Sequence, residues 1–169
     1  MRPINPIIRL YATALFCVAM LAAMPFAEML AVTASAPMHT HFVYMFAHAN
    51  LFHWVVNSWS LLVLHNAFRW YRCVASYIVA VTASFLTFMV DEVPTIGASV
   101  ITCFFLGYIA PNFWINRQRT TVIMTAAILI LGFAFPGIAA ALHVALYVAG
   151  LIYYGVERTI RSISTYITQ

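Results

Sequence analysis

The sequence contains no lysine and few charges of either sign: eight arginines and four acidic residues in a chain of 169. Charged residues make up 7% of the chain, against roughly 25% in an average water-soluble domain. Hydrophobic residues make up 64%. This balance excludes an ordinary soluble domain and indicates a protein embedded in a lipid bilayer. The arginines are too few, and too widely scattered in pairs, to indicate binding of nucleic acid.

Cysteines are scarce as well. Cys17, Cys73 and Cys103 are odd in number, lie in or beside apolar stretches and form no Cys-x-x-Cys pair. We therefore expect small buried side chains, with neither a disulfide framework nor a metal site. No cofactor is predicted.

Six apolar stretches are separated by short connections, and a chain of this length allows about six spans of ~20 residues. They cover about 7–30, 50–68, 73–90, 95–115, 121–135 and 138–156. The first stretch has some features of a signal peptide, but its apolar run exceeds the roughly 7–15 residues of a signal core. We predict an uncleaved first helix. The expected fold is an all-α membrane protein, a six-transmembrane-helix bundle forming a single domain over residues 1–169.

The residues between the six stretches predict loops, a helix cap, a turn and a chain break. Residues 31–49 are predicted to form an outer loop, and the polar residues 157–169 an interfacial helix. Asn50 is a predicted N-cap of the second helix. A polar turn is predicted at Asp91 and Glu92, and a chain break at Pro136 and Gly137. In the last span, small residues at a spacing of four predict a close helix contact; they are Gly137, Ala141, Ala145 and Ala149.

The arginines predict the orientation of the chain. With six spans, all four arginine pairs fall on one side of the membrane and three of the four acids fall near the other; the pairs are Arg2 and Arg9, Arg69 and Arg72, Arg117 and Arg119, and Arg158 and Arg161. The positive-inside rule makes the arginine side cytoplasmic. We therefore predict a multi-pass protein of the cell membrane with both termini in the cytoplasm.

Three sets of polar side chains lie inside the predicted spans, where such groups are costly and usually face the bundle interior. His53 and Asn57 share one face of the second span because they are four residues apart. Ser99 is predicted to lie about one turn inside the fourth span, and His143 lies in the sixth. Each alone has a structural explanation, such as a hydrogen bond to the backbone or to a neighbouring helix. At 1.5 Å per residue all three sets lie about 5–8 Å past the outer start of their helices, which predicts one shared polar pocket.

These residues resemble the signatures of the rhomboid family of intramembrane serine proteases. The resemblance consists of His-x-x-x-Asn at His53 and Asn57 with His48 upstream, Gly-x-Ser at Gly97 and Ser99, and His143 followed seven residues later by Gly150. The match covers the six-helix core in chain order. The first pattern is fairly specific and Gly-x-Ser alone is weak, whereas the ordered set with the expected topology is a strong signal.

The resemblance implies a bundle whose active site opens outward and cleaves transmembrane protein substrates in the bilayer by a Ser–His dyad. Ser99 would be the nucleophile and His143 the general base. His53, Asn57 and the backbone N–H of Ser99 would form the oxyanion hole. The resemblance gives supporting roles to His48, Gly97 and Gly150.

Three positions depart from the family's pattern. Val100 replaces the second glycine of Gly-x-Ser-Gly, Cys103 stands where an aromatic residue often follows the serine, and Leu146 stands where a small residue follows the histidine. These departures motivate an alternative, a catalytically inactive rhomboid-like protein that binds membrane proteins. A small transporter with its His and Asn side chains along a polar path is a further alternative, although the inner halves of the spans offer little to continue such a path. The oligomeric state stays open.

Overall fold

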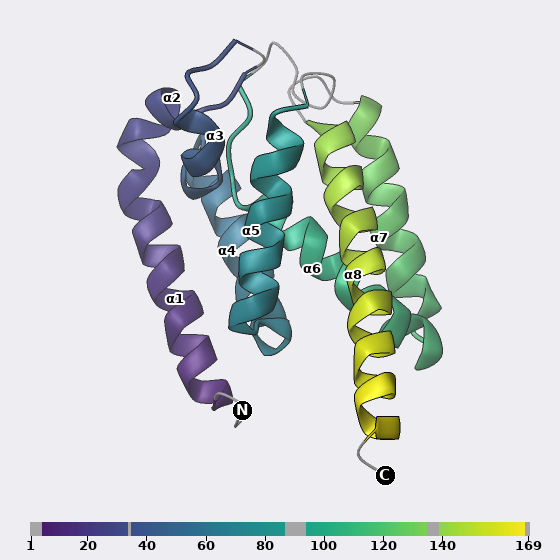
Figure 1. Ribbon diagram of the computed structural model, residues 1–169. Helices are drawn as coiled ribbons and strands as arrows, with labels where there is room; N and C mark the ends of the chain where they lie inside the picture. Colours follow the sequence, from purple (N-terminus) through teal and green to yellow (C-terminus); the bar gives the residue numbers. More distant parts are fainter. Residues whose placement is uncertain (1–4, 34, 87–93, 135–138, 168–169) are drawn as a thin grey trace.

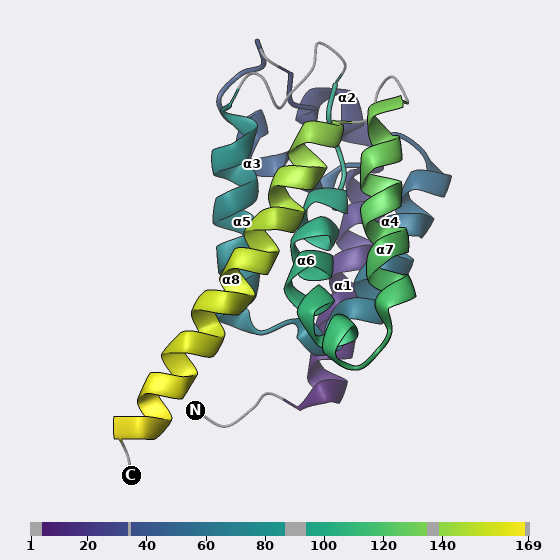
Figure 2. The ribbon, with the colours of Figure 1, turned by 90° about the vertical axis from the view of Figure 1, so that its right-hand side faces the viewer.

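The computed structural model describes residues 5–33, 35–86, 94–134 and 139–167, and the regular structure of these residues is helical, as predicted. The α-helices are α1 (Pro6–Ala23), α2 (Ala27–Leu30), α3 (Thr40–Val43), α4 (Leu51–Leu64), α5 (Trp70–Ser84), α6 (Ser99–Ile115), α7 (Arg119–Leu131) and α8 (Ala140–Ile167). Short 3-10 turns occur at Met24–Phe26, Tyr44–Phe46, His65–Ala67 and Gly132–Ala134. Helix α6 lies in the interior, where it contacts α4, α5, α7 and α8 (Figures 1 and 2).

Each longer helix overlaps one of the six predicted apolar stretches, but the bounds differ: α5 begins three residues before the predicted 73–90, and α8 runs eleven residues beyond the predicted 138–156. Over the described ranges, two helices are long and apolar enough by themselves to cross a membrane, Pro6–Leu30 and Ala140–Tyr166. Helix α6 and the helix Arg119–Ala134 are apolar but shorter. The predicted turn at Asp91 and Glu92 and the predicted break at Pro136 and Gly137 lie outside the described residues. The count of six spans therefore stays a prediction.

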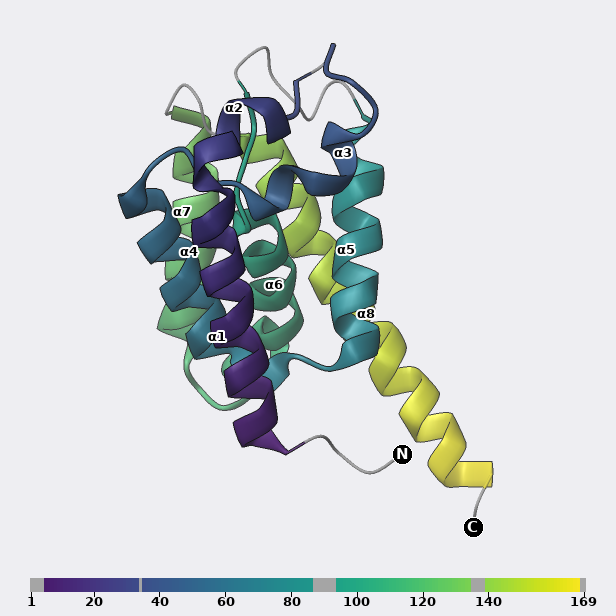
Figure 3. The same ribbon diagram turned by 90° about the vertical axis from the view of Figure 1, so that its left-hand side faces the viewer.

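The fourth helix begins at Ser99 and not at Thr95, so the prediction that Ser99 lies one turn inside it is wrong. Thr95 is instead extended and exchanges two backbone hydrogen bonds with Val32, at 3.0 and 2.8 Å. Gly97 has a φ of +115°, which interrupts any helix and favours glycine. As a result α6 starts well below the upper ends of α5, α7 and α8 (Figures 1 and 3).

Part of the segment between the first two long helices, predicted as a loop, packs into the bundle. It contains α3 and the 3-10 turn, whose Tyr44 and Met45 are fully buried in the same apolar cluster as Phe104 of α6. The Tyr44 hydroxyl donates to the Ala80 carbonyl of α5 at 3.2 Å, and the Tyr44 carbonyl accepts from the N–H of Gly97 at 3.0 Å. This segment therefore fixes the extended chain that leads into α6.

Two glycines bring α6 and α8 into close contact. A Cβ atom on Gly107 would overlap the carbonyl oxygen of Tyr147, and a Cβ atom on Gly150 would overlap the carbonyl oxygen of Phe104. The alanines of the predicted small-residue stripe are only partly buried, whereas Gly150 is buried. Because Ser99 and His143 lie on these same two helices, the glycine contact sets the distance between them.

Helix α8 continues to Ile167, so the polar tail prolongs the last apolar stretch as one helix (Figure 2). In the C-terminal half of α8, Glu157 accepts two hydrogen bonds from the largely buried Arg72 of α5, at 2.9 and 2.8 Å. Glu157 also pairs with Arg161 one turn later. A single carboxylate thus joins α5 to α8 and neutralises two arginines at this end of the bundle.

Candidate active site

Ser99 and His143 meet where the N-terminal ends of α6 and α8 lie together. Nε2 of His143 lies 2.7 Å from Oγ of Ser99, which is the first residue of α6. His143 lies in the first turn of α8, and its backbone N–H donates to the Ala139 carbonyl at 3.1 Å. A neutral imidazole with its proton on Nδ1 accepts the serine hydroxyl at Nε2. This is the arrangement that a nucleophile and its base require.

A second Ser–His contact in the chain shows that the distance alone does not identify such a pair. Nδ1 of His41 lies 3.0 Å from Oγ of Ser84, and both residues are buried. The Ser84 hydroxyl, however, donates to the Val81 carbonyl at 2.7 Å, so His41 must be the donor in this contact. The His41 ring also stacks on Phe85 at 4.1 Å. This pair fastens α3 to α5 and leaves no hydroxyl proton for a base to remove.

The first turn of α4 positions His53. The side chain of Asn50 accepts from the backbone N–H of His53 at 2.9 Å, which confirms the predicted N-cap. One turn later, Nδ2 of Asn57 donates to the His53 carbonyl at 3.0 Å, and this bond uses one of its two amide protons. Both side chains therefore face the same way from α4.

Gly97 leaves the space into which His53 and Asn57 project. A Cβ atom at residue 97 would lie 2.8 Å from Nε2 of His53 and 3.6 Å from Nδ2 of Asn57. A side chain here would thus collide with the imidazole and would also be strained by the positive φ. The two side chains of α4 consequently approach the backbone just before Ser99.

His48 lies behind these residues. It is fully buried, and its ring packs edge-on against the ring of His53 with centroids 5.0 Å apart. Its Nε2 accepts a long hydrogen bond of 3.5 Å from the N–H of Ala98. His48 therefore supports both His53 and the turn that carries Ser99.

A pocket of about 160 Å³ lies in front of Ser99 and His143; its lining consists of Ala49, His53, Pro94, Thr95, Ile96, Ser99, Ala139 and His143. Asn57 is nearly fully buried beside it and does not contribute to the lining. The three departures from the family's pattern, Val100, Cys103 and Leu146, are all buried in the main apolar cluster away from this pocket.

The cysteines take no part in this site. Cys17 and Cys103 are buried and unpaired, whereas Cys73 is exposed, contrary to the expectation of a buried side chain. Among the residues that the structure describes, no group of three or more His, Cys, Asp or Glu side chains is placed to hold a metal ion. The chemistry that this arrangement offers is that of a serine and a neutral histidine.

Sequence comparison places the chain in a family. A search of curated proteins finds no significant match. The family model described as the Rhomboid domain matches residues 35–155, which is most of the chain and includes Ser99 and His143. The match and the apolar helices together indicate a membrane protein. The chain belongs to the rhomboid family.

Proposed function

We propose that this protein is an intramembrane serine endopeptidase that hydrolyses peptide bonds in or near transmembrane segments of other membrane proteins. The proposal is carried by the contact of 2.7 Å between the Ser99 hydroxyl and His143, beside a pocket large enough for part of a peptide. No other hydrogen-bond partner of this hydroxyl is found in the described parts of the chain. We also propose that residues 1–169 form one domain with six spans and both termini in the cytoplasm.

The proposed reaction proceeds in two halves. In the first, Oγ of Ser99 attacks the scissile carbonyl carbon while His143 takes the hydroxyl proton, and His143 then gives that proton to the departing amine. An acyl-enzyme ester remains on Ser99. In the second half, His143 takes a proton from a water molecule that attacks the ester, and the serine oxygen recovers this proton as the carboxylic acid leaves. No acidic residue is needed in either half.

The negative charge of the tetrahedral intermediate would be stabilised at the start of α6. Because Ser99 is the first residue of the helix, its backbone N–H has no acceptor within the helix. The helix dipole adds partial positive charge at the same place. The side chains of His53 and Asn57, which gather over Gly97, would supply the other donors.

Asn57→Ala is expected to lower kcat by about 10²–10³-fold, because it removes one donor to the oxyanion. The matched control is Ser60→Ala in the same helix, which also removes a side-chain hydrogen bond to the carbonyl four residues earlier, at 2.8 Å. The control should change kcat by less than a few-fold. Steady-state cleavage of a reporter in liposomes measures both, and equal losses in the two variants would show that the effect is structural.

The buried departures Val100, Cys103 and Leu146 favour the peptidase over the inactive alternative, because none of them enters the pocket in front of Ser99. Their side chains change the packing of α6 and α8 without filling the space that a substrate would need. Whether the protein is instead an inactive homologue is tested by measuring cleavage of a reporter protein.

The function is tested with the purified full chain and single-span reporter proteins in liposomes. Helices hide their peptide bonds in i→i−4 hydrogen bonds, so a reporter with Gly or Pro near the outer membrane face should be cut faster than its Ala counterpart. Mass spectrometry of the fragments locates the cut. We expect cleavage near the outer face by the native chain and none by Ser99→Ala; intact reporters with the folded native chain would support the inactive alternative.

A further inference from the structure

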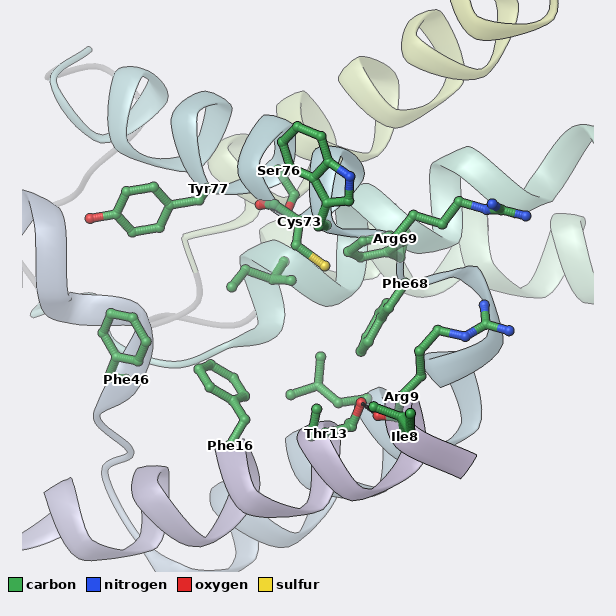
Figure 4. A pocket seen from close by; sticks show the side chains of 15 residues that line it. Ile8, Arg9, Thr13, Phe16, Phe46, Phe68, Arg69, Cys73, Ser76 and Tyr77 are labelled. Atoms are coloured by element: carbon green, nitrogen blue, oxygen red, sulfur yellow. Dashed lines mark hydrogen bonds between the residues drawn. The ribbon is translucent and has the colours of Figure 1, made fainter. Parts of the chain in front are cut away.

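An apolar groove, larger than the pocket at Ser99, is lined by side chains of α1, α5 and α6 (Figure 4). Figure 3 shows how these helices are arranged in the bundle. Its volume is about 400 Å³, within the range of roughly 300–1,000 Å³ typical of small-molecule sites. One wall is the stripe Ile8, Ala12 and Phe16 of α1, and the floor includes Phe105 of α6. Ile8 is 59% exposed, so the groove reaches the surface that faces lipid in a membrane.

The three hydroxyl groups in the lining of the groove all donate hydrogen bonds to backbone carbonyls. The hydroxyl of Thr13 donates to the Arg9 carbonyl at 2.8 Å, and that of Ser76 donates to the Cys73 carbonyl at 2.8 Å. The hydroxyl of Tyr77 donates to the Phe42 carbonyl at 3.1 Å. What remains for an occupant is mostly hydrocarbon surface, together with the Cys73 thiol and the Trp70 ring.

One end of the groove is different, because the side chains of Arg9 and Arg69 both lie there (Figure 4). Nη1 of Arg9 donates to the Asn66 carbonyl at 2.7 Å, and Nε of Arg9 is buried with no hydrogen-bond partner. Within the described ranges neither arginine pairs with a carboxylate, in contrast to Arg72, which Glu157 neutralises. Two positive charges thus stand uncompensated at the end of an apolar groove.

We infer that this groove binds an anionic phospholipid of the cytoplasmic leaflet, with an acyl chain along α1 and the phosphate at Arg9 and Arg69. Arginine favours phosphate because its planar fork can donate two parallel hydrogen bonds. From Arg9 to Phe16 the groove follows α1 for about 10 Å, comparable with the ~15 Å half-thickness of the hydrocarbon core. Basic pockets between helices on the cytoplasmic side suit anionic head groups.

The inference rests on the proposed membrane orientation and is independent of peptidase activity. Lipid binding needs no chemistry at Ser99, so it can be measured equally on the native chain and on Ser99→Ala. A chain without peptidase activity could still bind the lipid, and an active peptidase could fail to do so.

The test is a titration of the detergent-purified full chain with dioleoyl phosphatidylglycerol or dioleoyl phosphatidylcholine, followed by native mass spectrometry. The two lipids share their acyl chains and differ in head-group charge. If each of the two arginines contributes about five-fold in affinity, the first binding event should be about 25-fold tighter for phosphatidylglycerol than for phosphatidylcholine. The double variant Arg9→Gln, Arg69→Gln should lose this preference.

Two control variants separate the groove from general surface charge. Arg117→Gln with Arg119→Gln removes two arginines elsewhere on the predicted cytoplasmic side and should keep the preference. Ala12→Phe fills the groove but keeps both of its arginines, so it should weaken the first binding event for both lipids.

Three results would overturn the inference. They are equal binding of the two lipids by the native chain, equal loss in both arginine double variants, or unchanged binding by Ala12→Phe. Inorganic phosphate that competes as well as the lipid would place the ligand at the arginines alone and would also overturn it. Ala12→Phe keeps the test decisive if the variant without Arg9 and Arg69 fails to fold.

Discussion

His143→Ala is expected to lower the rate of reporter cleavage by about 10⁴-fold or more, since loss of one member of a nucleophile–base pair disables the whole unit. The Ser99 hydroxyl would keep its position at the start of α6 but would have no base 2.7 Å away. Initial rates in liposomes, measured at saturating reporter, give the loss in kcat. Ser99→Ala should lower the rate to a similar extent, and the double variant should lower it little further.

The second Ser–His contact provides the matched control for this prediction. His41→Ala removes an imidazole that lies 3.0 Å from the Ser84 hydroxyl, so the variant loses a similar contact outside the pocket. It should lower thermal stability, because a buried hydrogen bond and a ring stack are lost. The kcat of the folded fraction should stay within a few-fold of native. Comparable losses of kcat in the two histidine variants would contradict the dyad.

Gly150→Ala is expected to destabilise the protein by about 3 kcal/mol or more, because the added Cβ overlaps a backbone carbonyl that cannot move as a side chain does. The overlap is with Phe104 of α6, so relief requires α6 and α8 to separate. A shift of about 1 Å between Ser99 and His143 would cost on the order of 10²-fold in rate. Thermal unfolding in detergent and reporter cleavage measure the two effects.

Gly155→Ala is the control for the glycine contact, because it makes the same substitution in the same helix. A Cβ atom at residue 155 meets nothing within 4 Å. Alanine is favoured over glycine in a helix by about 1 kcal/mol, so this variant should be at least as stable as native and equally active. If the two substitutions behave alike, close packing of α6 on α8 does not position the dyad.

The sequence predicted the parts of the site that depend on local spacing. Asn50 caps α4, and His53 and Asn57 face the same way because four residues make about one helical turn. The contact between Ser99 and His143 could be anticipated only as a shared depth, since no local rule places two helices beside each other. Pairing of Ser99 with His143 was predicted from the resemblance to the rhomboid family.

The position at which α6 starts could not be predicted from the local sequence. Residues 95–98 are apolar enough to extend a helix, but Thr95 pairs with Val32, more than sixty positions earlier in the chain. Gly97 was the available signal, because glycine often marks a positive φ. The shift matters for function, since it places Ser99 at the first helical position with a free N–H.

Long-range contacts account for the other features that spacing could not reveal. His41 and Ser84 lie 43 positions apart and meet only because the segment before α4 folds inward. The exposed Cys73 lines a groove whose opposite wall is α1, so its environment depends on how α1 and α5 pack. Composition alone predicted a buried thiol there.

Covalent labelling by a fluorophosphonate probe shows whether Ser99 is a nucleophile activated by His143. The serine oxygen displaces fluoride from phosphorus, and peptide mass spectrometry identifies the modified residue. We expect labelling of Ser99 in the native chain and in Ser84→Ala, no labelling in Ser99→Ala, and very slow labelling in His143→Ala. Equal labelling of the native chain and Ser99→Ala would contradict this role of Ser99.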